Sequence, residues 1–186
     1  MTIHMTRELR GFSLEYRFRE APNYLGLGNC TLGVFLQALT LQEANCGDVL
    51  RLRQTNLLLR LLEALTLHLV ACTPYHLEKG DASVGTLLRK PLSIECRMTL
   101  GEDYYALKKE QGERYTWLKN GEKLAAYEKE SISMMEQHRY TIEIEEKARE
   151  ELPLCLLMAM AIDRIFYPGR GRVSFMKIER TYRLWK

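Results

Sequence analysis

The sequence predicts a mainly β (α+β) fold, an antiparallel β-barrel or strongly curled sheet around one buried hydrophobic helix at about residues 150–166. Three observations predict it. Several segments alternate apolar and polar residues with the period of two that a half-buried strand requires. Asn120-Gly121 stands between two apolar segments, as at the tip of a hairpin. One segment near the C-terminus is apolar on every helical face, and such a helix has to be buried on all sides.

The N-terminal third contains three segments with this alternation. Between the first and the second, Asn23, Gly26 and Gly28 interrupt the pattern and are expected to form a turn. The three predicted strands lie at 12–18, 32–38 and 49–53.

The leucine-rich run 56–71 fits two structures. Its leucines form one stripe at helical spacing, yet from Leu65 to Leu69 they alternate with polar residues as in a strand. Because periodicity alone does not resolve short apolar runs, helix and strand both stay open. A strand is slightly favoured for the second half of the run.

Residues 80–146 are expected to form antiparallel strands joined by tight turns. Glycine-containing turn signals lie at 79–81 and 101–103. Asn120 and Gly121 both tolerate the positive φ of a type I′ turn, which makes this dipeptide a strong hairpin signal. The predicted strands are 84–88, 92–98, 104–108, 115–118, 123–129 and 140–144.

The segment 150–166 is the expected helix. Two glutamates at its start suit the positive end of the helix dipole, and Pro153 is acceptable in a first turn. A Pro-Gly pair at 168–169 ends the helix. In a β-rich chain, a barrel around this helix is one way to bury its whole surface.

Composition favours one soluble, cytoplasmic domain over residues 1–186. Hydrophobic residues make up 46% of the chain and charged residues 27%, which is ordinary for a globular protein. The start lacks the apolar region of a secretory signal, and the apolar run 152–162 is about half as long as a transmembrane helix requires. Five cysteines, odd in number and without a CxxC pair, argue against a disulfide framework and a structural zinc site. They are Cys30, Cys46, Cys72, Cys96 and Cys155.

No motif of catalysis, of metal binding or of a cofactor stands out. The four histidines form no HExxH or comparable arrangement, and no GxSxG marks a nucleophile. The acidic run 143–151 is interpreted as a solvated strand edge followed by a helix start, rather than as an acid–base pair. The sequence therefore predicts no catalytic residue, no metal and no cofactor.

Four features are shared with a known family: the short strand 84–92, the hairpin 115–130, the strand 139–146 and the apolar helix 154–166. Over residues 84–166 the chain resembles the tubby C-terminal-like superfamily, which includes the phospholipid scramblases and plant LURP-one-related proteins. It is most similar to small bacterial members. The resemblance implies a closed antiparallel barrel threaded by one hydrophobic helix. Tubby domains bind phosphoinositide head groups, but no motif here matches their lipid-contact residues.

The C-terminal segment 167–186 departs from that pattern, as one more strand or as a piece packed outside the barrel. Residues 170–186 contain six basic residues and one acidic residue, a net charge of +5 against +3 for the whole chain. Such a surface suits an anionic lipid head group or an acidic protein partner. Nucleic acid is the least favoured ligand, because no base-reading motif is present. The competing interpretation is a solvated edge strand whose charges discourage aggregation. The candidate ligand-binding residues are Arg170, Arg172, Lys177, Arg180 and Arg183.

The sequence thus predicts a non-enzymatic binding module that presents a basic surface to an anionic lipid head group or a protein partner. A subunit of a larger assembly, joined through 56–71, is the alternative. A small enzyme with a pocket at the barrel mouth is a third interpretation, less favoured than these two.

Overall fold

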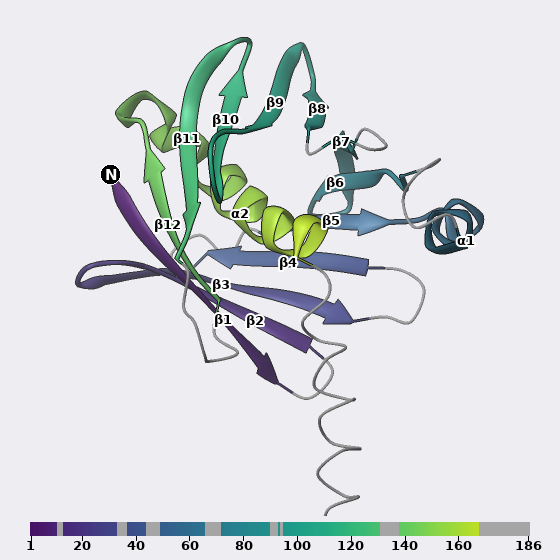
Figure 1. Cartoon of the computed structure of the whole chain (residues 1–186), viewed down its shortest axis with the longest axis horizontal. Helices are drawn as coiled ribbons and strands as arrows, with labels where there is room; N and C mark the ends of the chain where they lie inside the picture. The colour runs from purple at the N-terminus through teal and green to yellow at the C-terminus, as the bar shows by residue number, and fades with distance from the viewer. Residues whose placement is uncertain are drawn as a thin grey trace, which may run out of the picture.

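The structure is a computed structural model, and it describes residues 1–10, 13–32, 37–43, 49–65, 72–89, 93, 95–130 and 138–167. Within these ranges, twelve antiparallel strands close into one barrel, and a helix near the C-terminus runs through it (Figure 1). The predicted mainly β fold around one buried helix is therefore confirmed.

The strands follow one another around the barrel in chain order. They are β1 (Thr2–Arg10), β2 (Ser13–Glu20), β3 (Asn23–Leu32), β4 (Gln37–Glu43), β5 (Val49–Gln54), β6 (Tyr75–Lys79), β7 (Ala82–Arg89), β8 (Cys96–Leu100), β9 (Asp103–Lys109), β10 (Arg114–Lys119), β11 (Glu122–Lys129) and β12 (His138–Ile144). Helix α1 (Leu57–Leu65) lies between β5 and β6, and the short 3-10 helix η1 (Glu146–Glu151) leads into α2 (Leu152–Phe166).

The barrel has two distinct ends. Each strand pairs with its neighbours in the chain, and β1 pairs with β12 to close the ring. Because all pairs are antiparallel, the odd-numbered strands finish at one end and the even-numbered strands at the other. Lys119, the last residue of β10, bonds to Glu151 where α2 begins. Tyr115, near the start of β10, bonds to Tyr167 just after α2 ends. We term these the proximal end, where α2 begins, and the distal end, where α2 finishes.

The interior of the barrel is packed with side chains from the strands and from α2. Along β2, the alternate residues Leu14, Tyr16 and Phe18 are buried, as the period of two predicts. Helix α2 has eleven buried residues, which lie on all of its sides. Asp163 is the one charged residue among them. The apolar surface that identified this helix in the sequence is therefore the surface that the strands cover.

Two glycines expected in a turn lie inside β3 instead. Gly26 and Gly28 pair with residues of β2 and β4. A Cβ at Gly28 would overlap with Sδ of Met160 on α2, so the missing side chain makes room for the helix. The turn expected at Asn23 precedes it, at Ala21 and Pro22.

The strand predicted over 32–38 is also wrong. Leu32 ends β3 and Gln37 begins β4, and these two residues are register partners across the connection between the strands. Residues 33–36 lie outside the described part. The alternation carries on from one strand to the next, so it does not show where the chain reverses. The strand predicted over 92–98 begins later, at Cys96.

The first half of the leucine-rich run is helical. α1 covers Leu57–Leu65, and the side chain of Asn56 caps it by accepting a hydrogen bond from the Leu59 amide at 3.0 Å. Leu65, where the favoured strand alternation starts, is the last residue of the helix. Residues 66–71, which hold most of the predicted strand, lie outside the described residues.

The predicted hairpin at Asn120-Gly121 is confirmed. Lys119 and Glu122 are register partners on either side of the turn. Asn120 has φ of 49° and Gly121 has φ of 89°, so both residues adopt the positive φ that a type I′ turn requires.

Candidate functional site

The basic residues predicted to bind an anionic ligand lie beyond Tyr167, outside the described residues. They are Arg170, Arg172, Lys177, Arg180 and Arg183. The structure does describe the point from which this segment continues, at the distal end of the barrel.

Aromatic and cationic contacts fix that point to the barrel wall. The hydroxyl oxygens of Tyr167 and Tyr115 lie 2.8 Å apart, and Nζ of Lys129 lies 3.6 Å from the centre of the Tyr167 ring. Phe166 stacks on Tyr115 at 5.4 Å between ring centres, and the Arg89 guanidinium lies 5.4 Å from the Phe166 ring. The chain is therefore held by β7, β10 and β11 where it leaves α2.

Inside the barrel, three polar side chains surround one carboxylate. Asp163 on α2 is fully buried. Its Oδ2 accepts hydrogen bonds from Nη1 of Arg7 at 2.8 Å and from the Tyr16 hydroxyl at 3.0 Å. Its Oδ1 accepts a bond from the Tyr140 hydroxyl at 2.6 Å. We term these four residues the Asp163 cluster.

The electrostatics of the Asp163 cluster favour a structural role. Burial, and then the Asp163 carboxylate, raise the pKa of Tyr16 and of Tyr140 well above the ordinary value. Both phenols therefore remain protonated donors at neutral pH, and Arg7 balances the buried negative charge. A carboxylate that is buried, ion-paired and hydrogen-bonded at both oxygens is better suited to holding the surrounding elements in place than to transferring protons.

The Asp163 cluster was not predicted from the sequence, although the sequence contains two signals of it. Arg7 stands at an inward position of β1, two residues after Met5, where an apolar residue is expected. The apolar run 152–162 continues to the end of α2, and Asp163 is the one acidic residue of this helix. Each is a charge inside an apolar pattern, and opposite charges of this kind are expected to pair when buried.

The buried thiols are not activated. Burial raises the pKa of Cys30 to about 11 and the pKa of both Cys96 and Cys155 to about 12. A nucleophilic cysteine needs a lowered pKa, because the thiolate is the reactive form. Among the described residues, no group of three or more His, Cys, Asp or Glu side chains is arranged to hold a metal ion.

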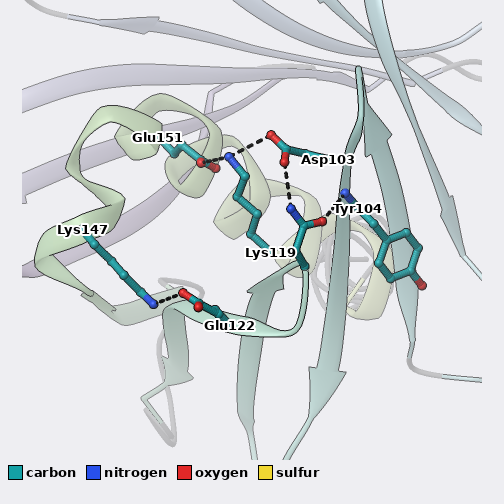
Figure 2. A network of polar contacts seen from close by, with 7 residues as sticks. Asp103, Tyr104, Lys119, Glu122, Lys147 and Glu151 are labelled. Carbon is teal, nitrogen blue, oxygen red and sulfur yellow. Dashed lines mark hydrogen bonds and ion pairs between the residues drawn. The ribbon is translucent and has the colours of Figure 1, made fainter.

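At the proximal end, a polar network ties the start of α2 to two hairpins (Figure 2). Nζ of Lys119 lies 2.6 Å from Oε1 of Glu151 and 2.9 Å from Oδ2 of Asp103. The side chain of Asn120 donates to Asp103 at 2.8 Å and accepts from the Tyr104 amide at 2.9 Å. Lys119 thus neutralises a carboxylate on either side of it, and the network joins the start of α2 to the barrel wall.

The distal end presents an apolar surface on α1. Four leucines of this helix are between 39% and 80% exposed, and we term them the leucine face: Leu57, Leu58, Leu61 and Leu62. Figure 1 shows α1 beyond the tip of β5, outside the barrel wall. In the described part of the chain, no helix has both the length and the apolar character needed to cross a membrane.

Two candidates for interaction are thus left: the leucine face of α1 at the distal end, and the basic segment, whose chain continues from Tyr167 at that end. Comparison with known proteins gave no relative, because no family model, no curated protein and no solved structure matches this chain.

Proposed function

We propose that this protein is a non-enzymatic binding module whose basic C-terminal segment, 167–186, engages the head groups of an anionic lipid. One observation carries the proposal. The interior of the barrel is occupied by the eleven buried residues of α2, so a partner has to be met on the outside. The segment that leaves the distal end has the strongest concentration of charge in the chain, a net +5 over 170–186.

The charges of this segment are sufficient for reversible binding to a membrane surface. Near an anionic leaflet, each lysine or arginine contributes about 1 kcal/mol, within a Debye length of about 8–10 Å. The five candidate residues, four arginines and one lysine, together therefore contribute several kcal/mol if they face the membrane at the same time. They are Arg170, Arg172, Lys177, Arg180 and Arg183.

The chemistry of the interior supports a binding role over an enzymatic one. The buried phenols of Tyr16 and Tyr140 and the buried thiols of Cys30, Cys96 and Cys155 all have raised pKa values. None of these groups is therefore ready to act as a base or nucleophile at neutral pH.

The resemblance to the tubby C-terminal-like superfamily supports the same ligand class. A closed barrel threaded by a hydrophobic helix is the fold that this resemblance implies. Head groups of anionic lipids are what tubby domains bind.

The proposal is tested with vesicles of phosphatidylcholine containing phosphatidylserine, sedimented with the full chain over a series of salt concentrations. In one variant, the five candidate residues 170, 172, 177, 180 and 183 are replaced by glutamine. The matched control removes five basic side chains from the proximal end, and both variants lose the same charge. The control residues are Arg19, Lys79, Lys123, Lys147 and Arg149.

We expect the C-terminal variant to lose binding and most of its salt dependence, because salt weakens only the electrostatic contribution. The proximal control is expected to keep both. Equal loss in the two variants would point to net charge alone, and unchanged binding in the C-terminal variant would contradict the proposal.

A subunit role in a larger assembly is the second candidate, favoured by the exposed leucine face of α1. An interface of that kind would give a complex of defined mass when the protein is purified from its native cell at low salt. A strictly monomeric mass under those conditions would exclude it.

A further inference from the structure

We infer that the leucine face of α1 inserts into the surface of an anionic bilayer, so that the distal end of the barrel faces the membrane. The inference rests on the proposed function and adds an apolar contact to the electrostatic one. It is carried by the position, exposure and charged surroundings of α1.

α1 exposes the side that a short helix ordinarily buries. It has nine residues, and helices of this length usually depend on packing of their apolar face for stability. Leu58 is 80% exposed, and Leu57, Leu61 and Leu62 are 39–44% exposed. Their spacing puts all four on one stripe of the helix. We therefore expect this stripe to be buried against a partner surface when the protein performs its function.

Basic side chains are also exposed on the outer wall at the distal end. Arg53 on β5 precedes α1 by four residues, and its side chain is exposed. Further along the same end, Leu88 on β7 is 50% exposed and is the register partner of the exposed Arg97 on β8. The distal part of the wall thus exposes a cationic side chain on β5, an apolar one on β7 and a cationic one on β8, and an anionic surface on this side would meet them.

The basic C-terminal segment continues from the same end. α1 follows the last residue of β5, and Tyr167 lies against β10 and β11 where α2 finishes. Both positions are at the distal end, because β5 and β11 run in the direction of α2. A membrane on this side would meet the leucine face at the end of the barrel from which the basic segment continues.

The composition of α1 favours a bilayer over a protein partner. Protein interfaces concentrate their binding energy in Trp, Tyr and Arg, and leucine is under-represented among such residues. The sequence of α1, LLLRLLEAL, has no aromatic residue. Besides its leucines α1 has one basic residue, Arg60, and one acidic residue, Glu63, and Arg53 precedes it on β5. A leucine-rich face with basic side chains nearby is a feature of helices that lie in the interface of an anionic membrane.

The test uses the full chain with two kinds of vesicle, phosphatidylcholine alone and phosphatidylcholine with phosphatidylserine, over a salt series. The variant is Leu58→Gln/Leu61→Gln, because glutamine keeps the helix propensity of leucine and both positions are exposed. The control, Tyr24→Gln/Tyr104→Gln, removes two apolar side chains of 45% and 40% exposure from the proximal end. Circular dichroism and thermal unfolding verify that both variants fold.

We expect the leucine variant to bind anionic vesicles about tenfold more weakly at every salt concentration, with the salt dependence unchanged. The tyrosine control is expected to bind like the original protein. Backbone amides of residues 57–65 should exchange hydrogen more slowly when anionic vesicles are present. These results together would support insertion of α1.

Other outcomes separate the inference from the proposed function. If the leucine variant binds like the original protein while the C-terminal glutamine variant does not, α1 does not insert but the basic segment still binds lipid. If the original protein binds neither kind of vesicle, both ideas fail and a protein partner is left to cover α1. Equal binding to neutral and anionic vesicles would contradict the requirement for an anionic lipid that the proposed function and this inference share.

Discussion

Arg7 on β1 and Asp163 on α2, 156 residues apart in the chain, form a buried ion pair of 2.8 Å. The pair lies at the seam where β1 meets β12 and the barrel closes. The same carboxylate accepts bonds from Tyr16 on β2 and Tyr140 on β12, so one residue of the helix holds three adjacent strands. Closure of the barrel and docking of α2 are therefore coupled through Asp163.

The first prediction removes one partner of this pair. Arg7→Met leaves the Asp163 carboxylate buried without its counter-charge, and we expect a loss of about 3–5 kcal/mol in the free energy of unfolding. Arg7→Met/Asp163→Leu should recover much of this loss, because no charge then stays buried. Urea unfolding of both variants measures the difference. Equal stability of the single and double variants would show that the loss in Arg7→Met does not come from a buried carboxylate without a counter-charge.

The second prediction concerns the contact between β3 and α2. Gly28→Ala places a Cβ where Met160 now packs, and we expect a loss of about 1–3 kcal/mol from overpacking. Met160→Ala removes the obstructing atoms, so the combined variant should lose less than the sum of the two single losses. Urea unfolding of all four proteins gives the coupling energy. If the two losses add strictly, contact with Met160 is not the reason for a glycine at position 28.

The third prediction follows from the buried thiols. With Ellman's reagent at pH 8, Cys30, Cys96 and Cys155 should not react in the folded protein and should react after denaturation. Their folded pKa values of about 11 to 12 lie above the ordinary value of 9.0. Because the folded pKa values are raised, the contribution of these thiols to stability is complete below pH 9 and declines as pH rises through the folded values. Fast labelling of these three residues, identified by mass spectrometry, would contradict their burial.

The fourth prediction tests the turn between β10 and β11. Gly121 has φ of 89°, and no atom lies near the position of a Cβ, so only backbone strain opposes a side chain there. Gly121→Val should lose about 1–3 kcal/mol of stability, because a β-branched residue resists positive φ. Gly121→Asn should lose less, since asparagine tolerates this region. Thermal unfolding ranks the two, and equal losses would argue against strain as the cause.

The strands and the helix were predictable because their signals are local. Residues 14–18 alternate in the sequence as they do in the wall of the barrel, and the apolar surface of 154–166 required burial wherever the helix was placed. Asn120-Gly121 specifies its own turn geometry. In each case the residues that carry the signal also form the element.

The errors arose where the cause lies far away in the chain. Gly28 breaks the local pattern because of Met160, more than a hundred residues later, and so it resembled a turn. Arg7 and Asp163 each looked like an isolated charge, and only the closed barrel brings them together. The predicted ligand-binding residues 170–183 stay a prediction, because they lie outside the described residues.

The fifth prediction concerns the network at the proximal end. Lys119 links Glu151 at the start of α2 to Asp103, the first residue of β9. Hydrogen bonds from Lys119, and then from Asn120, lower the pKa of Asp103 below its ordinary value of 3.8. A carboxylate with a lowered folded pKa stabilises the protein above that ordinary value, and the contribution is lost as pH falls through the folded value.

Lys119→Met should therefore be less stable than the original protein at pH 7, and the difference should shrink as pH falls below about 4. The control is Lys108→Met, which removes an exposed lysine from β9 without touching the network. Its difference from the original protein should stay constant over the same pH range. Urea midpoints measured from pH 7 to pH 3 for all three proteins decide the matter. A Lys119→Met difference that is independent of pH would mean that the lysine acts through packing rather than through its bond to Asp103.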